Sequence, residues 1–106
     1  MIVGGNSVPG LRDILRASAR LAILRFLADD SDYRLNTSVL EDALVAIGLD
    51  LTRGQIETEC AWLEERDCVA SERVGTVTVI RLTERGGDVA AGRVRVEGVK
   101  RPGPGA

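Results

Sequence analysis

The apolar residues of this chain recur at two kinds of spacing, which predict helices and strands respectively. Spacings of three and four residues predict three helices, over residues 11–29, about 37–47 and about 52–66. Alternation of apolar and polar residues predicts two strands around a turn at Val74–Gly75, over residues 68–73 and 76–82. In this hairpin, Val77, Val79 and Leu82 are expected on one face. A short fourth helix is expected from Thr83 to about Ala91, ended by Gly92.

Polar residues and glycines mark the ends of these helices. Ser38 followed three residues later by Glu41 fits a capping box at the start of the second helix, and Asn36 and Thr37 are alternative N-caps. Thr52 followed three residues later by Gln55 forms a capping box before the third helix. Each helix start is therefore signalled locally, and the segment between the first two helices, DDSDYRLN, is expected to be a turn-rich connection.

The first helix carries two apolar stripes that point in different directions. One stripe contains Leu11, Ile14, Leu15, Ala22 and Phe26. The other contains Ile23, Leu24 and Leu27. Because residues of a helix turn by about 100° each, both stripes cannot face one core. One stripe should meet the second and third helices, and the other either the C-terminal helix or a second subunit. We therefore treat Leu11, Ile14 and Leu15 as candidate interface residues.

The order helix, helix, helix, hairpin, helix predicts an α+β fold of the winged helix-turn-helix type. In that fold three helices form the core, two strands form a wing, and a short helix follows. The predicted domain covers residues 11–92. A flexible arm is expected over residues 1–10, and a basic, Pro/Gly-rich tail, extended and without a core, over residues 93–106.

Composition narrows the functions that the domain can have. The chain has 106 residues, 44% of them hydrophobic and 28% charged, which predicts one globular domain. It has no histidine, and its two cysteines, Cys60 and Cys68, are expected to be structural. This set excludes serine–histidine and cysteine–histidine catalysis and supplies too few ligands for a zinc site. We therefore expect no enzyme activity, no metal and no cofactor. No membrane-length apolar run or signal peptide is visible, so a cytoplasmic protein is expected.

Four stretches of the chain resemble a known family. DYRLNTSVLEDAL, CAWLEE, RLTERGGDVAAGR and VEGVKRPGPG are similar to small proteins of Mu-like bacteriophages and prophages, which are often classed as ArsR-type regulators. The resemblance covers residues 11–105. It implies a winged-helix fold, a phage origin and a bacterial host cell, and it brings no established activity. ArsR metal sensors carry a cysteine pair where this chain has Cys60 alone, so metal sensing is not implied.

The charge of the predicted helix-turn-helix conflicts with a role in reading DNA. Residues 36–67 contain eight carboxylates and two arginines, a net charge of −6, whereas residues 68–106 carry +3. Because affinity for DNA comes largely from cations that neutralise phosphates, the third helix is expected to contribute only near its start. Arg12, Arg16 and Arg20 follow one another at four-residue spacing and predict a basic ridge on the first helix. An alternative interpretation is that the arginines form a solvated surface.

Two hypotheses follow. In the first, the protein binds duplex DNA as a transcriptional regulator or accessory factor. Its candidate contacts are Arg53, Gln55 and Thr58 on the third helix, Arg73, Arg81 and Arg85 around the wing, and Arg93, Arg95, Lys100 and Arg101 in the tail. In the second, the protein is an interaction module with an acidic helix-turn-helix, serving in packaging or another late step. Its partner is then another protein or a second copy, and Trp62 is either an interface anchor or packed against the wing.

Overall fold

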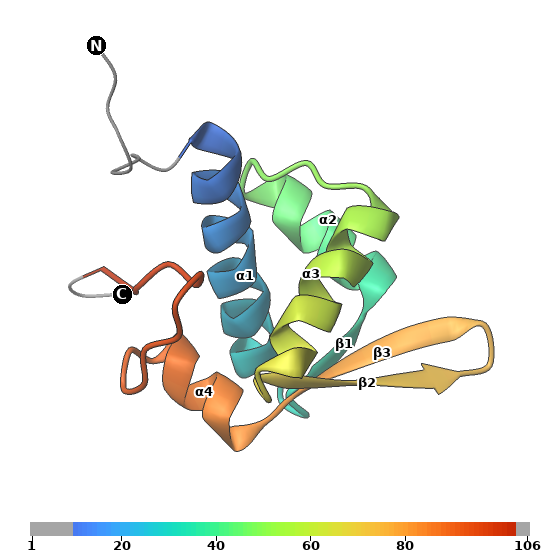
Figure 1. The fold of residues 1–106 in the computed structure, drawn as a ribbon. Helices are drawn as coiled ribbons and strands as arrows, with labels where there is room; N and C mark the ends of the chain where they lie inside the picture. Colours follow the sequence, from blue (N-terminus) through green and yellow to red (C-terminus); the bar gives the residue numbers. More distant parts are fainter. Residues whose placement is uncertain (1–9, 104–106) are drawn as a thin grey trace, which may run out of the picture.

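The computed structural model describes residues 10–103, which form an α+β fold with four helices and one three-stranded antiparallel sheet (Figure 1). The elements in chain order are α1 (Leu11–Asp29), β1 (Arg34–Asn36), α2 (Thr37–Ala46), α3 (Arg53–Glu65), β2 (Val69–Val74), β3 (Val77–Leu82) and α4 (Glu84–Ala90). No helix within these residues is long and apolar enough to cross a membrane. The predicted arm over residues 1–10 lies outside the described residues, except for Gly10, the N-cap of α1.

The predicted start of α3 is confirmed, whereas the start of α2 uses the alternative N-cap and not the Ser38–Glu41 capping box, because Ser38 lies inside the helix. Asn36 is the N-cap of α2, and its side chain accepts the backbone N–H of Val39 at 2.8 Å. The capping box of α3 is complete, because Thr52 Oγ1 accepts from the N–H of Gln55 while Gln55 Oε1 accepts from the N–H of Thr52. These bonds pair backbone N–H groups at the helix N-termini, which have no acceptor within the helix itself.

The C-terminal end of α3 uses an aspartate where glycine is common. Asp67 has a φ of 61°, in the left-handed region. Its N–H donates to the carbonyl of Glu64, and the N–H of Cys68 donates to that of Leu63, each at 3.0 Å. These two bonds form a Schellman motif. The chain thus turns sharply from α3 into β2 without a glycine.

The sheet has three strands in the order β1-β3-β2, one more than predicted. The expected strands of the hairpin are confirmed, with each end within one residue of its predicted position. The segment before α2 was expected to be a connection without a strand, and this is wrong for its last three residues. Residues 34–36 form β1, which pairs antiparallel with β3 along its free edge. Val77 and Val79 share one face of β3, as expected, but Leu82 lies on the opposite face with Ile80, because side chains alternate along a strand. Ile80 is the core residue at 1% exposure, whereas Val77 is 42% exposed at the outer end of the hairpin, which extends past the helices (Figure 1).

One apolar core joins the helices to the sheet, and its largest fully buried side chains are Ile23, Leu24, Leu27, Leu40, Leu44, Ile56, Leu63 and Ile80. The second stripe of α1 therefore faces the core. Of the first stripe, Ala22 and Phe26 are partly buried against the core, whereas Leu11, Ile14 and Leu15 are 70%, 51% and 46% exposed. Among residues 10–103, the first turns of α1 lie at the edge of the core with their large apolar side chains exposed.

The residues after α4 pack on the body of the protein. Val96 and Val99 are each 8% exposed and belong to the core. The N–H of Lys100 donates to the carbonyl of Ala17 on α1 at 3.2 Å. The expectation of an extended tail without a core is therefore wrong for this part of the chain, which we call the C-terminal segment (residues 94–103).

Candidate nucleic-acid interface

The start of α3 presents three candidate DNA contacts, and each is engaged within the chain. The Arg53 guanidinium lies 2.9 Å from Glu41 Oε1 of α2. The Gln55 side chain completes the capping box, and Thr58 Oγ1 donates to the carbonyl of Gly54 at 3.0 Å. All three residues are exposed, as expected. They remain within reach of a ligand, but contact with it must compete with these internal bonds.

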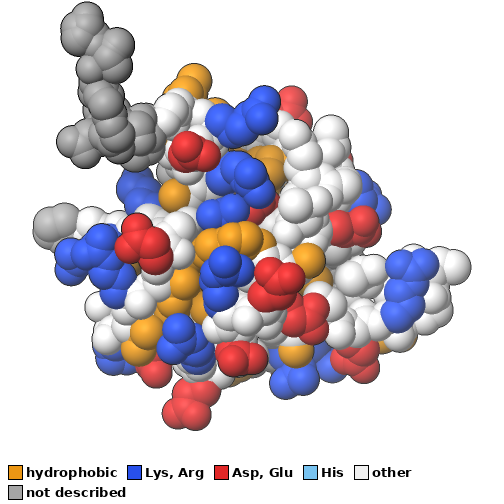
Figure 2. Space-filling view, in the orientation of Figure 1, with side chains coloured by type: hydrophobic (Ala, Val, Ile, Leu, Met, Phe, Trp, Pro, Cys, Tyr) orange, Lys and Arg blue, Asp and Glu red, His pale blue; other side chains and the backbone are white. Residues whose placement is uncertain are grey.

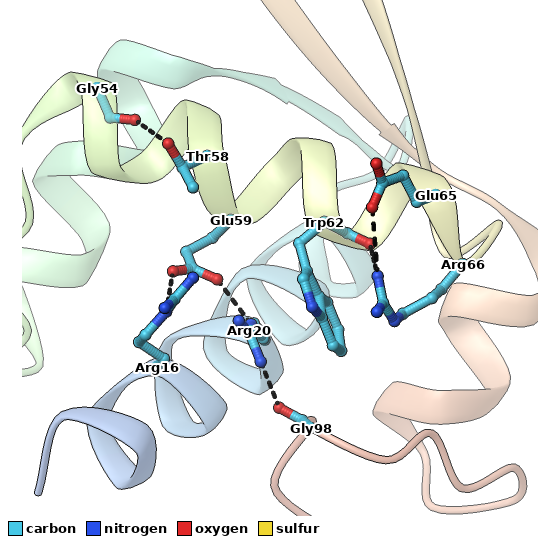
Figure 3. Close-up of polar contacts among 9 residues, drawn as sticks. All are labelled: Arg16, Arg20, Gly54, Thr58, Glu59, Trp62, Glu65, Arg66 and Gly98. Atoms are coloured by element: carbon cyan, nitrogen blue, oxygen red, sulfur yellow. Dashed lines mark hydrogen bonds and ion pairs between the residues drawn. The ribbon is translucent and has the colours of Figure 1, made fainter.

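Glu59 of α3 is buried in an ion triad (Figure 3). Its side chain accepts from Arg20 Nε at 2.6 Å and from Arg16 Nε at 2.9 Å. Arg20 also donates from Nη1 to the carbonyl of Gly98 at 3.0 Å. The predicted free basic ridge on α1 is therefore wrong for Arg16 and Arg20, which neutralise a carboxylate of α3. In the fold, these two arginines therefore neutralise part of the negative charge counted over residues 36–67.

Trp62 lies next to this triad, between two guanidinium groups (Figure 3). Those of Arg20 and Arg66 lie 3.7 and 3.6 Å from the centre of its ring, a distance suited to cation–π attraction. A Cβ built on Gly98 would lie 2.7 Å from a ring carbon. Trp62 thus packs between α1, α3 and the C-terminal segment. The interpretation that it packs against the hairpin is wrong, and a role as an interface anchor stays a prediction.

Other carboxylates of α3 also have structural partners. Glu64 Oε2 accepts the backbone N–H of Ser71 on β2 at 3.2 Å. Because β2 is an edge strand, this bond satisfies a donor that β3 does not reach. Glu65 lies 3.5 Å from Arg66 in an exposed pair. Packing therefore explains Glu59 and, in part, Glu64, whereas Glu57, Glu64 and Glu65 still face solvent.

The hairpin carries a first group of cations. Arg73 and Arg81 are exposed, and Arg73 Nη1 donates to Thr78 Oγ1 at 3.1 Å. Arg34 on β1 lies directly opposite Arg81 in the sheet. Sequence reasoning missed Arg34 because it assigned this residue to a connection. The only local signal was the short polar–apolar alternation from Arg34 to Asn36.

A second group of cations lies on the other side of the helices. Arg95, Lys100 and Arg101 are exposed on the C-terminal segment, which lies across the body from the hairpin (Figure 1). Figure 2 shows cations at both of these sides, with both signs mixed between them. The fold does not bring the candidate residues of the hairpin and of the C-terminal segment together on one surface.

The remaining two candidates are tied to their neighbours. Arg85 Nε donates to the carbonyl of Arg66 at 3.0 Å, which joins α4 to the end of α3. Arg93 forms an ion pair with Asp88 at 3.0 Å. Both side chains help to hold α4 in place, so each guanidinium already has a partner within the chain.

Both cysteines are buried and free. Burial, together with the nearby Glu59 carboxylate, raises the pKa of the Cys60 thiol to about 12. Burial also raises the pKa of Cys68, against an opposing effect of Arg85. The two thiols are therefore protonated at neutral pH, as expected of core residues. Within residues 10–103, no group of three His, Cys, Asp or Glu side chains is placed to hold a metal ion.

The fold and surface define a small α+β protein with an acidic helical layer, a cationic hairpin and a packed C-terminal segment. The chain belongs to the family of gp26 of Escherichia phage Mu, with which it is 44% identical over 94 residues, 89% of this chain and 97% of gp26. A protein of Haemophilus influenzae is 32% identical over 63 residues, 59% of this chain and 61% of that protein. No family model and no solved structure matches the chain. The resemblance to Mu-like phage proteins is confirmed, while its ArsR part stays a prediction.

Proposed function

We propose that this chain is a winged-helix protein that binds duplex DNA through the phosphate backbone, as a regulator or accessory factor in phage growth. The role is one of binding and not of catalysis. Support for the winged helix comes from the order of elements, in which α2 and α3 are joined by residues 47–52 and followed by an antiparallel hairpin. The short strand β1 beside β3 completes the sheet.

The observation that carries the proposal is the projecting hairpin. β2 and β3 extend beyond the helices (Figure 1), with Arg73 exposed near their outer end and Arg81 exposed near their base, beside β1. Neither guanidinium has a carboxylate within ion-pair distance among residues 10–103. Both charges are thus available to phosphate groups, unlike those of Arg16, Arg20, Arg53 and Arg93.

The mode of binding follows from the surface of α3. Glu57 and Glu64 are exposed along this helix and would repel phosphates on either side of a groove. Phosphate contacts fix the position of a protein on DNA, whereas base contacts supply specificity. With the hairpin as the main contact and α3 withdrawn, we propose weak dependence on DNA sequence.

The proposal is tested by titrating full-length protein into a labelled DNA duplex at several salt concentrations. Log affinity should fall with log salt by about 0.9 for each phosphate contact. Arg73→Ala should weaken binding and lower that slope by about 1. Arg95→Ala is the matched control, since it removes an exposed arginine on the other side of the molecule. A titration without binding at low salt, for duplexes of any sequence, contradicts the proposal.

A second candidate function is protein interaction through α1. Leu11, Ile14 and Leu15 form an uncovered apolar face beside a groove between α1 and the start of α3. Exposed apolar groups gain free energy when another chain covers them. We propose that a second copy of the chain does so.

Sedimentation equilibrium across a range of protein concentrations tests this candidate. The wild type should dimerise, and Leu11→Ser with Leu15→Ser should shift it to monomer. Val45→Ser, which changes a similarly exposed apolar residue on α2, should leave the dimer intact. A wild type that stays monomeric at every concentration rules this candidate out.

A further inference from the structure

Two arginines lie side by side on the outer face of the sheet. Arg34 of β1 and Arg81 of β3 are direct partners in the antiparallel register, and Ala70 of β2 lies on the far side of Arg81. Directly opposite residues point to the same face, with Cβ atoms about 4.5–5.5 Å apart. Both arginines are exposed, and the small Ala70 leaves the row open.

The backbone holds this pair together. The next residues along the strands, Leu35 and Ile80, are also partners, and they point to the opposite face, where they pack in the core. Because side chains alternate along a strand, core packing of Leu35 and Ile80 fixes Arg34 and Arg81 outward. The backbone positions of the two arginines are therefore held side by side by the core.

Neither guanidinium of the pair is in ion-pair contact with a carboxylate of residues 10–103. Like charges directly opposite each other destabilise a sheet. Glu72, on the same face, is the partner of Val79 and so lies diagonally from Arg81. The Asp30 carboxylate accepts the backbone N–H groups of Asp32 and Arg34.

We propose that Arg34 and Arg81 form a phosphate-binding pair that takes a phosphodiester group of duplex DNA. This inference rests on the proposed function. A phosphate between the two guanidinium groups replaces their repulsion with two charge-assisted contacts, and the planar guanidinium suits two-point binding of phosphate oxygens.

The distribution of cations favours duplex DNA over an acidic peptide. Arg73 is the partner of Thr78, which points to the same face as Ile80 and opposite to Arg81. The hairpin therefore carries cations on both of its faces. Phosphates line both sides of a DNA groove, and the major groove admits a two-stranded ribbon. A peptide strand would lie along one face only.

The test measures the affinity of full-length variants for a DNA duplex by fluorescence anisotropy at several salt concentrations. Arg34→Gln and Arg81→Gln should each weaken binding roughly tenfold at low salt. Each should lower the salt slope by about 1. The fold-loss of affinity in the double variant should be smaller than the product of the two single fold-losses, because the pair shares one phosphate. Arg25→Gln, an exposed arginine of α1, is the control and should behave as wild type.

A second measurement separates binding from folding. Without DNA, Arg34→Gln should raise the thermal midpoint, because it removes the repulsion of Arg81. A variant that binds worse and yet melts higher has lost a ligand contact and not its fold. A lower midpoint for Arg34→Gln, with weaker binding in proportion, overturns the inference.

The remaining outcomes separate the two proposals. If the wild type binds duplex DNA and both variants keep its affinity and slope, the phosphate pair is wrong and the proposed function stands. If the wild type binds no duplex, both are wrong. If poly-glutamate binds as tightly as DNA and depends equally on Arg34, the assignment of the pair to DNA is overturned.

Discussion

Asp67 occupies a backbone position that most residues avoid. Its φ of 61° ends α3, and its carbonyl accepts a hydrogen bond from Thr83 Oγ1 at 2.6 Å, which ties the turn to the cap of α4. A side chain in the left-handed region crowds the backbone, and aspartate tolerates this better than most residues. Its negative charge also lies at the C-terminal end of a helix, where the helix dipole is unfavourable to anions.

We expect Asp67→Gly to stabilise the fold by about 1 kcal/mol, because glycine adopts this φ freely. Asp67→Ala should destabilise it, since alanine keeps the Cβ and tolerates the region less well. Asp67→Asn separates the effect of the backbone angle from that of the charge. It removes the negative charge, and asparagine tolerates the left-handed region as aspartate does. The free energies of unfolding come from urea denaturation. A glycine variant less stable than wild type contradicts this account of the turn.

At the same scale, Glu59 shows what a sequence pattern leaves out. The helical pattern of α3 correctly predicted the burial of Ile56, Cys60 and Leu63, because apolar residues three and four apart define a face. It gave no reason to bury Glu59. The reason lies 43 and 39 residues earlier, in Arg16 and Arg20. A buried charge is tolerable only with such partners, and pairing over that distance is not encoded locally.

Among the elements, those with local signals were predicted and those formed by distant contacts were not. Capping residues and apolar spacing sufficed for the four helices. β1 was missed because three residues beside a turn become a strand only when the edge of β3 is available. Gly86 lies inside α4, where glycine ordinarily weakens a helix. In the fold, a Cβ there would lie 2.0 Å from the carbonyl oxygen of Cys68, so glycine allows α4 to approach the start of β2.

The same division explains the outcome for the candidate interface. Arg73 and Arg81 were found because a hairpin is a local structure with a recognisable turn. Arg34 was missed with its strand. That the hairpin and the C-terminal cations lie on different sides depends on the packing of α4 and the C-terminal segment against α1, which no local pattern shows. The sequence therefore predicted which residues are exposed better than it predicted which of them lie on the same side of the molecule.

For the molecule as a whole, the C-terminal segment completes the core. Pro and Gly residues suggested an extended tail, but two of its valines are buried and its backbone bonds to α1. Gly98 sits at the junction with a φ of 97°. Its carbonyl accepts from Arg20, and its Cα faces the Trp62 ring. The glycine is thus required both by the backbone angle and by the close approach.

We expect Gly98→Ala to destabilise the protein by about 2 kcal/mol or more, because the added Cβ meets the Trp62 ring at 2.7 Å in a strained conformation. Gly103→Ala is the matched control. Nothing lies within 4 Å of a Cβ at Gly103, so its effect should stay within about 0.5 kcal/mol. Trp62 is the sole tryptophan of the chain, so fluorescence reports its surroundings directly. Its emission should shift in the Gly98 variant alone, as the segment lifts from the ring. Equal unfolding free energies and equal emission in the two variants would mean that the C-terminal segment does not hold Trp62, and that α1 and α3 form the core without it.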